Sequence, residues 1–257
     1  MNSLVFINRF FAPDHSATSQ LLSDLAFALA RHGADVKVIT SRQLYDDPSI
    51  RLDAEETIHG VRVTRIATSR FGRDGLVGRT SDYATFYLNA TRILLHRLKA
   101  GDLLIAKTDP PLLSLCAGYA AKQRGATLVN WIQDLFPEVA TALDLNPIRV
   151  ATPILQRLRN LTLQEAACNV VLGERMKERL LQARIEPDRI AVIPNWADGQ
   201  LIRPIRPEEN PLRAEWKLGD RFVVGYSGNM GRAHEFNTIL GAAEKLKTSE
   251  GIVFLFI

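Results

Sequence analysis

A glycine-containing loop at residues 227–231 (SGNMG) has the composition and spacing best suited in this sequence to binding an anion. It follows an apolar run at 222–226 and precedes a helical pattern, so we expect it to join a strand to a helix. Glycines there let the backbone approach a phosphate, and the free amides and dipole of the helix attract its charge. Arg232 and His234 add donors. A plain tight turn explains the same residues.

The loop at residues 9–19 follows the first apolar run, at the edge where open parallel sheets bind ligands. It contains no G-x-G-x-x-G pattern, which argues against a nicotinamide or flavin dinucleotide. Its polar side chains suit hydrogen bonding to a polyhydroxylated ligand or a diphosphate. Capping of the next helix by two of them is the alternative, and both roles are compatible. The polar residues are Asp14, His15, Ser16, Thr18 and Ser19.

Asp134 lies in the segment 130–138 (NWIQDLFPE), which leaves another predicted strand at the same edge of the sheet. Its carboxylate suits accepting hydrogen bonds from sugar hydroxyls or orienting the reacting one. The alternative is that Asp134 caps a helix predicted to start near Pro137. Trp131 and Phe136 are more typical of core packing than of sugar platforms.

Alternating strands and helices are predicted to position these loops. A strand at 4–7, a helix ended by Gly33 and a strand at 36–39 form the first unit. A strand at 103–106, a helix opened by the sequence DPP with Asp109 as cap and ended by Gly125, and a strand at 127–131 repeat it. Two such units predict an α/β, Rossmann-like doubly wound parallel sheet.

Other segments complete the predicted domain. Residues 57–66 indicate an antiparallel hairpin inserted between the two units. A helix at 81–98 carries aromatic residues flanked by basic ones, so it either lies on an anionic membrane or is an ordinary half-buried helix. A long helical stretch to about residue 167 follows, and then strands at 169–172 and 190–193 flank a helix at 174–183.

The predicted domains are an N-terminal Rossmann-like domain at 1–194, a linker at 195–220 and an incomplete second Rossmann-like domain at 221–257. The linker is rich in proline and polar residues. The second domain has predicted strands at 222–226 and 252–257 around a helix at 234–246. Two strands and one helix do not bury a sheet, so we expect this domain to be cut short after Ile257.

The composition is that of a globular protein, with 257 residues, 46% of them hydrophobic, and a net charge of +4. The basic excess suits a phosphate-bearing substrate or an anionic membrane, or is a solvated surface. The basic residues are scattered and no nucleic-acid motif is present, so no nucleic-acid partner is expected. Cys116 and Cys168 are expected to be reduced core residues, and no Cys/His cluster supports a metal site.

The apolar runs in the sequence are all short. The N-terminal run at residues 4–7 is too short for a signal peptide, and none elsewhere reaches the length of a membrane span. The sequence therefore predicts a cytoplasmic protein. The aromatic-basic helix leaves open a peripheral attachment to the inner face of the cell membrane.

Taken together, these segments resemble family 4 of the retaining glycosyltransferases, which have the GT-B fold of two facing Rossmann-like domains. The nearest resemblance is to the branch that builds bacterial surface polysaccharides of the colanic-acid and O-antigen type. The similar segments follow the family's order over nearly the whole chain. They are residues 11–19, 25–40, 109–111, 133–138, 193–198 and 225–231.

The resemblance implies transfer of a sugar from a nucleotide-diphosphate donor to a lipid-linked or glycan acceptor, with retention of configuration and without a metal or other cofactor. Asp134 and the loop at 14–19 would face the acceptor. A donor phosphate oxygen would take the acceptor's proton, while the protein positions both substrates and stabilises the leaving diphosphate. The residues that would bind the donor diphosphate are Gly228, Asn229, Arg232 and His234.

Three features depart from the family pattern. The family often has Gly-Gly where this chain has residues 15–17 (HSA). Asn229 and His234 stand where the family has the Arg and Lys that grip the diphosphate. The family's Glu-x7-Glu segment would lie beyond Ile257, so we expect little or no transfer by these residues alone. A GT-B-fold nucleotide-sugar epimerase and a non-catalytic fragment that binds an acceptor or a membrane are the alternatives.

Overall fold

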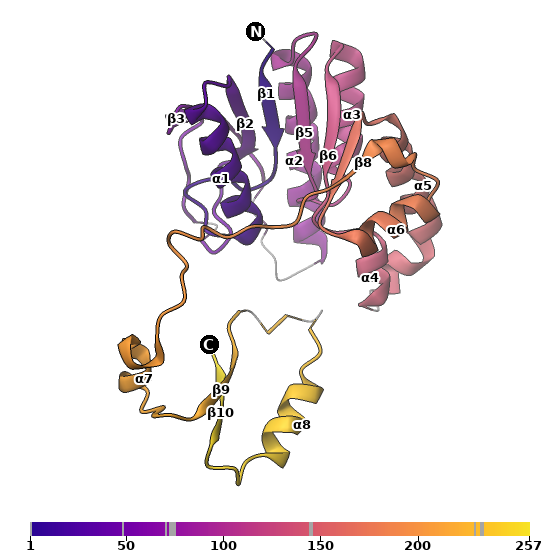
Figure 1. Ribbon diagram of the computed structural model, residues 1–257. Coiled ribbons are helices and arrows are strands. Elements are labelled where there is room, and N and C mark those ends of the chain that lie inside the picture. Colours follow the sequence, from indigo (N-terminus) through magenta and orange to yellow (C-terminus); the bar gives the residue numbers. More distant parts are fainter. Residues whose placement is uncertain are drawn as a thin grey trace. The chain divides into compact units, whose positions relative to one another are not determined.

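The computed structural model describes residues 2–47, 49–69, 71, 76–143, 146–228, 230–231 and 234–257. The chain forms two compact units, Met1–Trp196 and Ala197–Ile257 (Figure 1).

An eight-stranded sheet forms the centre of the first unit, in the order β3-β4-β2-β1-β5-β6-β7-β8. Neighbouring strands are parallel except β3 and β4, which are antiparallel. This arrangement confirms the predicted Rossmann-like parallel sheet. The strands are β1 Leu4–Ile7, β2 Val36–Ser41, β3 Glu55–Ile58, β4 Val61–Ile66, β5 Leu103–Lys107, β6 Thr127–Trp131, β7 Cys168–Val171 and β8 Ile190–Val192.

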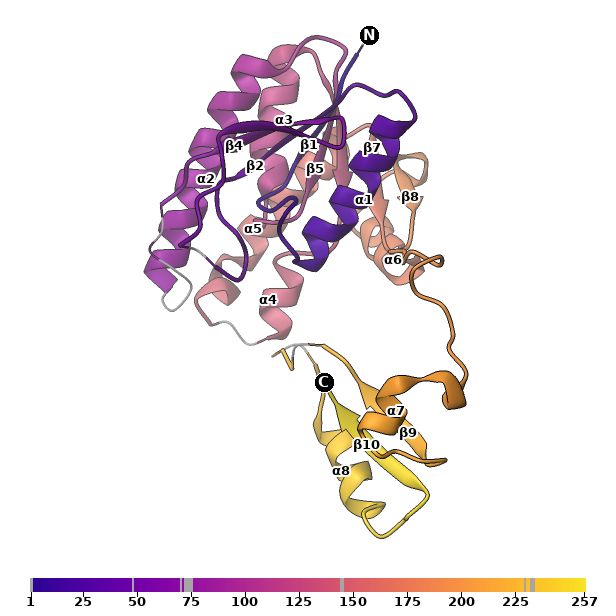
Figure 2. The same cartoon turned by 90° about the vertical axis from the view of Figure 1, so that its left-hand side faces the viewer.

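Helices cover both faces of this sheet, which makes it doubly wound (Figure 2). Leu22 and Ala26 of α1 pack with Phe6 on one face, whereas Phe86 and Leu94 of α2 pack with α3 on the other. The central strand β1 is apolar throughout because both of its faces are covered. The helices are α1 Ala17–Arg31, α2 Leu76–Arg97, α3 Leu113–Arg124, α4 Glu138–Ala142, α5 Asn146–Glu165 and α6 Glu174–Gln182.

Two glycines end the helices that lead into β2 and β6, as the sequence predicts. Gly33 follows α1 with a φ of 86°, and Gly125 caps α3 with a φ of 68°. Both angles lie in the left-handed region, where glycine has no Cβ to strain the backbone.

The predicted antiparallel hairpin is confirmed as β3 and β4, and β4 also pairs in parallel with β2, so the hairpin extends the main sheet. The structure corrects two other predictions about this unit. Asp109 does not cap α3, which begins at Leu113 after a left-handed Leu112. The long helical stretch before β7 is divided into α4 and α5.

The second unit contains two parallel strands, β9 Phe222–Tyr226 and β10 Ile252–Phe256, joined by α8 Asn237–Lys245. A short helix, α7 Pro211–Glu215, precedes them and is capped by Asn210, whose side chain accepts from the Leu212 amide at 3.0 Å. No side chain of β9, α8 or β10 is buried.

Candidate functional site

The carboxyl ends of β1, β5 and β6 lie at one edge of the first unit's sheet, because these strands are parallel neighbours. The loop after β1 and the first turn of α1 carry the predicted residues 14–19, and the loop after β6 carries Asp134. The sheet therefore brings the two predicted acceptor-side segments to one edge, with the end of β5 between them. This is the edge at which open α/β sheets bind ligands.

Asp14 is a buried hydrogen-bonding centre of the first loop. One of its carboxylate oxygens accepts from the Ser16 amide at 2.8 Å and from the Ser16 hydroxyl at 2.5 Å. The other accepts from the backbone amide of Tyr45, in the loop after β2. Asp14 thus joins two loops of the edge. Ser16 occupies the N-cap position of α1, but its side chain makes no capping hydrogen bond.

The other members of this loop divide into buried and accessible residues. Ser19 is fully buried, and its hydroxyl donates to the Asp14 carbonyl at 3.0 Å. The Thr18 carbonyl accepts from the Lys107 ammonium at 2.9 Å, and the Thr18 side chain is half-buried. His15 is exposed. His15 and Thr18 are therefore the members of this loop best placed to meet a ligand.

Lys107, the last residue of β5, is a buried cation at the centre of the edge. Its Nζ lies 3.9 Å from the centroid of the Trp131 ring, and Trp131 stacks on Trp196 at 5.7 Å. Burial lowers the pKa of Lys107 from 10.5 to about 7, with Asp109 acting in the opposite direction. The ammonium is therefore partly deprotonated at neutral pH and is held by a carbonyl and an aromatic face.

Asp134 is an exposed carboxylate at this edge. Desolvation by the surrounding protein raises the pKa of its carboxyl above the ordinary value of 3.8. It does not cap α4, whose N-cap is Pro137 with no side-chain capping bond. An exposed carboxylate with a raised pKa suits accepting a hydrogen bond from a substrate hydroxyl.

Arg9 is a second buried cation, which sequence reasoning missed together with Lys107. Its guanidinium carbon lies 5.1 Å from the ring centroids of both Phe10 and Tyr83. Its Nε is buried and, within the described residues, has no hydrogen-bond partner. The sequence does contain a sign of both residues. Each is a charged residue at the end of a buried apolar strand or just after one, and a charged residue is seldom buried there without a specific role.

Aromatic side chains of α2 contact Arg9 and the neighbouring loop after β5. Tyr87 donates its hydroxyl to the Pro111 carbonyl, and burial, with Tyr83 next, raises the pKa of its phenol. The aromatic residues of this helix thus contact the sheet edge, and Phe86, Ala90 and Leu94 are fully buried. These contacts support the half-buried alternative for the predicted helix at 81–98.

The glycine loop of the second unit follows β9. Gly228 has a φ of 141°, and its amide donates to the Ile257 carbonyl at 3.0 Å. The His234 Nδ1 and the Tyr226 hydroxyl share a hydrogen bond of 2.7 Å. Asn229 and Arg232 lie outside the described residues. The roles predicted for these residues remain predictions.

In the described part of the chain, no group of three or more His, Cys, Asp or Glu side chains is arranged to hold a metal ion. None of the helices traced there is both long enough and apolar enough to cross a membrane. Cys116 and Cys168 are free and half-buried.

Part of this chain is similar in sequence to a known protein. The chain is 30% identical over 167 residues to the probable glycosyltransferase WbjE of Pseudomonas aeruginosa. That alignment covers 64% of this chain and 41% of WbjE, so the chain spans less than half of that relative.

Solved structures show the same fold at low identity. HepE of Anabaena, in complex with UDP and glucose, is similar with a TM-score of 0.64 and 14% identity, over 100% of this chain and 61% of HepE. Sucrose-phosphate synthase of Thermosynechococcus elongatus is similar with a TM-score of 0.65 and 13% identity, over 99% of this chain and 70% of the synthase. The Glycosyl transferase 4-like domain family matches residues 18–196. The chain therefore belongs to the Glycosyl transferase 4-like domain family, and its structural neighbours are GT-B glycosyltransferases.

Proposed function

We propose that this chain is part of an enzyme that transfers a sugar from a nucleotide-diphosphate donor to a lipid-linked or glycan acceptor. The reaction takes place in the synthesis of a bacterial surface polysaccharide. The observation that carries the proposal is Asp134, an accessible carboxylate with a raised pKa at the ligand-binding edge of a family member's sheet.

In this proposal the carboxyl edge of the first unit holds the acceptor. Asp134 accepts a hydrogen bond from the acceptor hydroxyl and fixes its direction of attack. His15 and Thr18 contact the rest of the sugar, while Asp14 and Ser19 hold their loop in place. Lys107 keeps the β5 end fixed through its bond to the Thr18 carbonyl.

The second unit binds the donor diphosphate in this proposal. Backbone amides near Gly228, with Asn229, Arg232 and His234, stabilise the charge that develops on the leaving group. The complex of HepE with UDP and glucose supports a nucleotide-sugar donor as the class of substrate. Transfer retains the configuration of the donor sugar, because a donor phosphate oxygen takes the acceptor's proton on the same face. No metal is required.

The protein works at the inner face of the cell membrane, where lipid-linked acceptors lie. An exposed apolar face of α5 supports this part of the proposal: Val150 is 88% exposed, Ile154 66% and Leu161 49%. The exposed Arg157 on the same helix and the net charge of +4 suit an anionic surface. Ile154→Asp should reduce pelleting with phosphatidylglycerol vesicles, whereas Leu88→Asp on α2 should not. Equal pelleting of both variants would contradict this attachment.

The test incubates the complete gene product with a panel of radiolabelled nucleotide-diphosphate sugars, with and without a lipid-linked glycan fraction. The proposal predicts label in the glycan only when both are present, unchanged by EDTA, and a retained anomeric configuration by NMR. Interconversion of the donor sugar without acceptor would instead show an epimerase. Donor or acceptor binding without any turnover would show a non-catalytic protein. For residues 1–257 alone we expect little or no transfer.

A further inference from the structure

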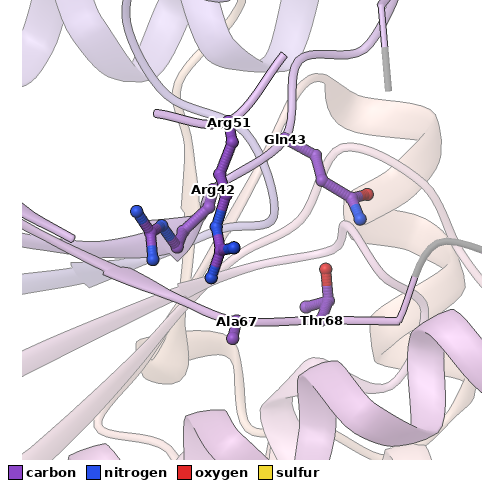
Figure 3. A pocket seen from close by; sticks show the side chains of 5 residues that line it. All are labelled: Arg42, Gln43, Arg51, Ala67 and Thr68. Atoms are coloured by element: carbon purple, nitrogen blue, oxygen red, sulfur yellow. The ribbon is translucent and has the colours of Figure 1, made fainter. Parts of the chain in front are cut away.

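A pocket of about 150 Å³ lies beside the proposed acceptor site, on the side of β2 and β4 (Figure 3). It is lined by Arg42, Gln43, Arg51, Ala67 and Thr68. Four of these residues directly follow the carboxyl ends of two parallel neighbours, because β2 ends at Ser41 and β4 at Ile66. The pocket therefore opens on the same sheet edge as Asp134.

The pocket has a positive charge that the described residues do not neutralise. None of the ion pairs formed within the described ranges involves Arg42 or Arg51. The Arg42 Nε donates to the Leu52 carbonyl at 2.7 Å, which anchors that guanidinium at the pocket wall. Arg51 is exposed. Two arginines are a suitable donor set for an oxyanion, because each guanidinium presents several N–H groups in one plane.

An unpaired hydroxyl also lines this space. The Thr68 Oγ1 is buried and has no hydrogen-bond partner among the described residues. In Figure 3 the Thr68 hydroxyl and the end of the Arg51 side chain point into the same space. Gln43 is fixed nearby, since its Nε2 donates to the Ser69 carbonyl at 2.9 Å. Burying an unpaired hydroxyl is destabilising, and a bound oxyanion would accept its hydrogen bond.

We propose that this pocket binds an anionic group of the acceptor, a phosphate or a carboxylate. The inference rests on the proposed function, because it assigns the substrate class of that same edge. The volume of about 150 Å³ is half the lower end of typical ligand pockets, which begin near ~300 Å³, so it suits a charged group rather than a nucleotide sugar.

The place of the pocket fixes which part of the acceptor is charged. Three strand spacings separate β2 from β6, which is about 14 Å at roughly 4.8 Å per spacing. The anionic group therefore lies away from the hydroxyl that Asp134 orients. The acceptor is thus long enough to reach from the β6 end to the β2 end of the edge.

The test is a titration of the 257-residue chain, followed by backbone amide NMR, with inorganic phosphate, with glucuronate and with neutral glucose. Saturable shifts confined to the loops after β2 and β4 are expected with phosphate or with glucuronate, and none with glucose. Saturation by phosphate alone identifies a phosphate group as the charged part, and saturation by glucuronate alone identifies a carboxylate. The absence of saturable shifts with both anions would overturn the proposal.

The Arg51→Ala variant gives a more specific test than the titration alone, because Arg51 is exposed and its loss should leave the fold intact. It should weaken the association constant of the anion about tenfold, as expected for one charge-assisted contact. Thr68→Val should lower the association constant less than Arg51→Ala does. Higher salt should lower the association constant of the unsubstituted chain. Arg175→Ala is the matched control, because its side chain is 96% exposed on α6. An equal effect of Arg51→Ala and Arg175→Ala would overturn the proposal.

The outcomes of this experiment distinguish a failure of the pocket proposal from a failure of the proposed function. Sugar transfer by the complete gene product together with no anion binding would refute the pocket and leave the transferase intact. Anion binding together with no transfer would refute the transferase and leave the pocket as a binding site.

Discussion

The two units of the chain differ in how their candidate loops are held. In the first unit the loops at 9–16 and 132–137 rise from strands whose side chains are buried on both faces of the sheet. In the second unit, Leu218 is the only apolar side chain among the described residues that is buried, at 6% exposure. The loop at Gly228 is held by the hydrogen bond from its amide to the Ile257 carbonyl and by the Tyr226–His234 pair.

This difference separates an edge that stands on a buried core from a loop that does not. The edge proposed to hold the acceptor has fixed geometry because moving it would expose core side chains and break buried hydrogen bonds. The loop proposed to bind the donor is bonded mainly through exposed groups, whose hydrogen bonds contribute little net stability. We therefore expect a substitution in the core of the first unit to lower the free energy of unfolding more than a comparable substitution in the second unit.

The largest contrast should come from leucine truncation on a helix of each unit. Leu94→Ala on α2 removes a fully buried side chain and should lower the free energy of unfolding by about 2–5 kcal/mol. Leu240→Ala on α8, where the side chain is 47% exposed, should cost less than about 1 kcal/mol. Urea denaturation followed by circular dichroism measures both. Similar losses in both variants would contradict the contrast between the units.

A pH-dependent contrast should come from Lys107. The pKa of Lys107 is about 7 in the folded state and 10.5 for an ordinary lysine, the value expected in the unfolded state. Between pH 7 and 10.5 the unfolded state therefore binds the proton and the folded state does not. Stability contributed by this group therefore rises with pH from 7 to 10.5, on the order of 1 kcal/mol per pH unit. Below pH 7 the penalty of burying the charge is fully present.

The Lys107→Met variant isolates this effect. The difference in unfolding free energy between the unsubstituted protein and Lys107→Met should change with pH between 7 and 9. The same difference for Lys122→Met should stay constant, because that side chain is 73% exposed on α3. A flat difference for Lys107→Met would show that the ammonium is fully protonated at these pH values.

The smallest contrast should come from single hydroxyl groups beside the two loops, Ser19 in α1 and Tyr226 in β9. Ser19→Ala removes a buried bond to the Asp14 carbonyl and should cost about 1–2 kcal/mol. Tyr226→Phe removes an exposed bond to His234 and should cost less than about 0.5 kcal/mol. The midpoints of urea unfolding measure both, and a larger loss for Tyr226→Phe would reverse the comparison.

The sequence predicts the regular elements well because their signals are local. Apolar runs at residues 4–7 and 127–131 match β1 and β6, and Gly33 and Gly125 mark the ends of α1 and α3. The hairpin at β3 and β4 is also found, but not its place in the sheet. That place depends on the pairing of β4 with β2, which is non-local and leaves no mark on the turn.

The candidate site is less predictable, since its geometry depends on contacts distant in sequence. Asp134 is recognised from its place after a strand, but its raised pKa comes from desolvation by the folded chain around it. Lys107 is missed because its bond to the Thr18 carbonyl joins residues 89 positions apart. Asp109 is misassigned as a cap because a DPP sequence suits a helix start, whereas α3 begins later at Leu113.

The most direct test of the account is Asp134→Asn in the complete gene product, compared with Asp188→Asn at the opposite edge of the sheet. The initial rate of sugar transfer should fall by about 100-fold or more in Asp134→Asn only, because the variant cannot accept the acceptor's hydrogen bond as a carboxylate does. Its unfolding midpoint at pH 7 should be equal or higher, because desolvation disfavours the charged form in the folded state. Transfer at the rate of the Asp188→Asn control would contradict the central role of Asp134.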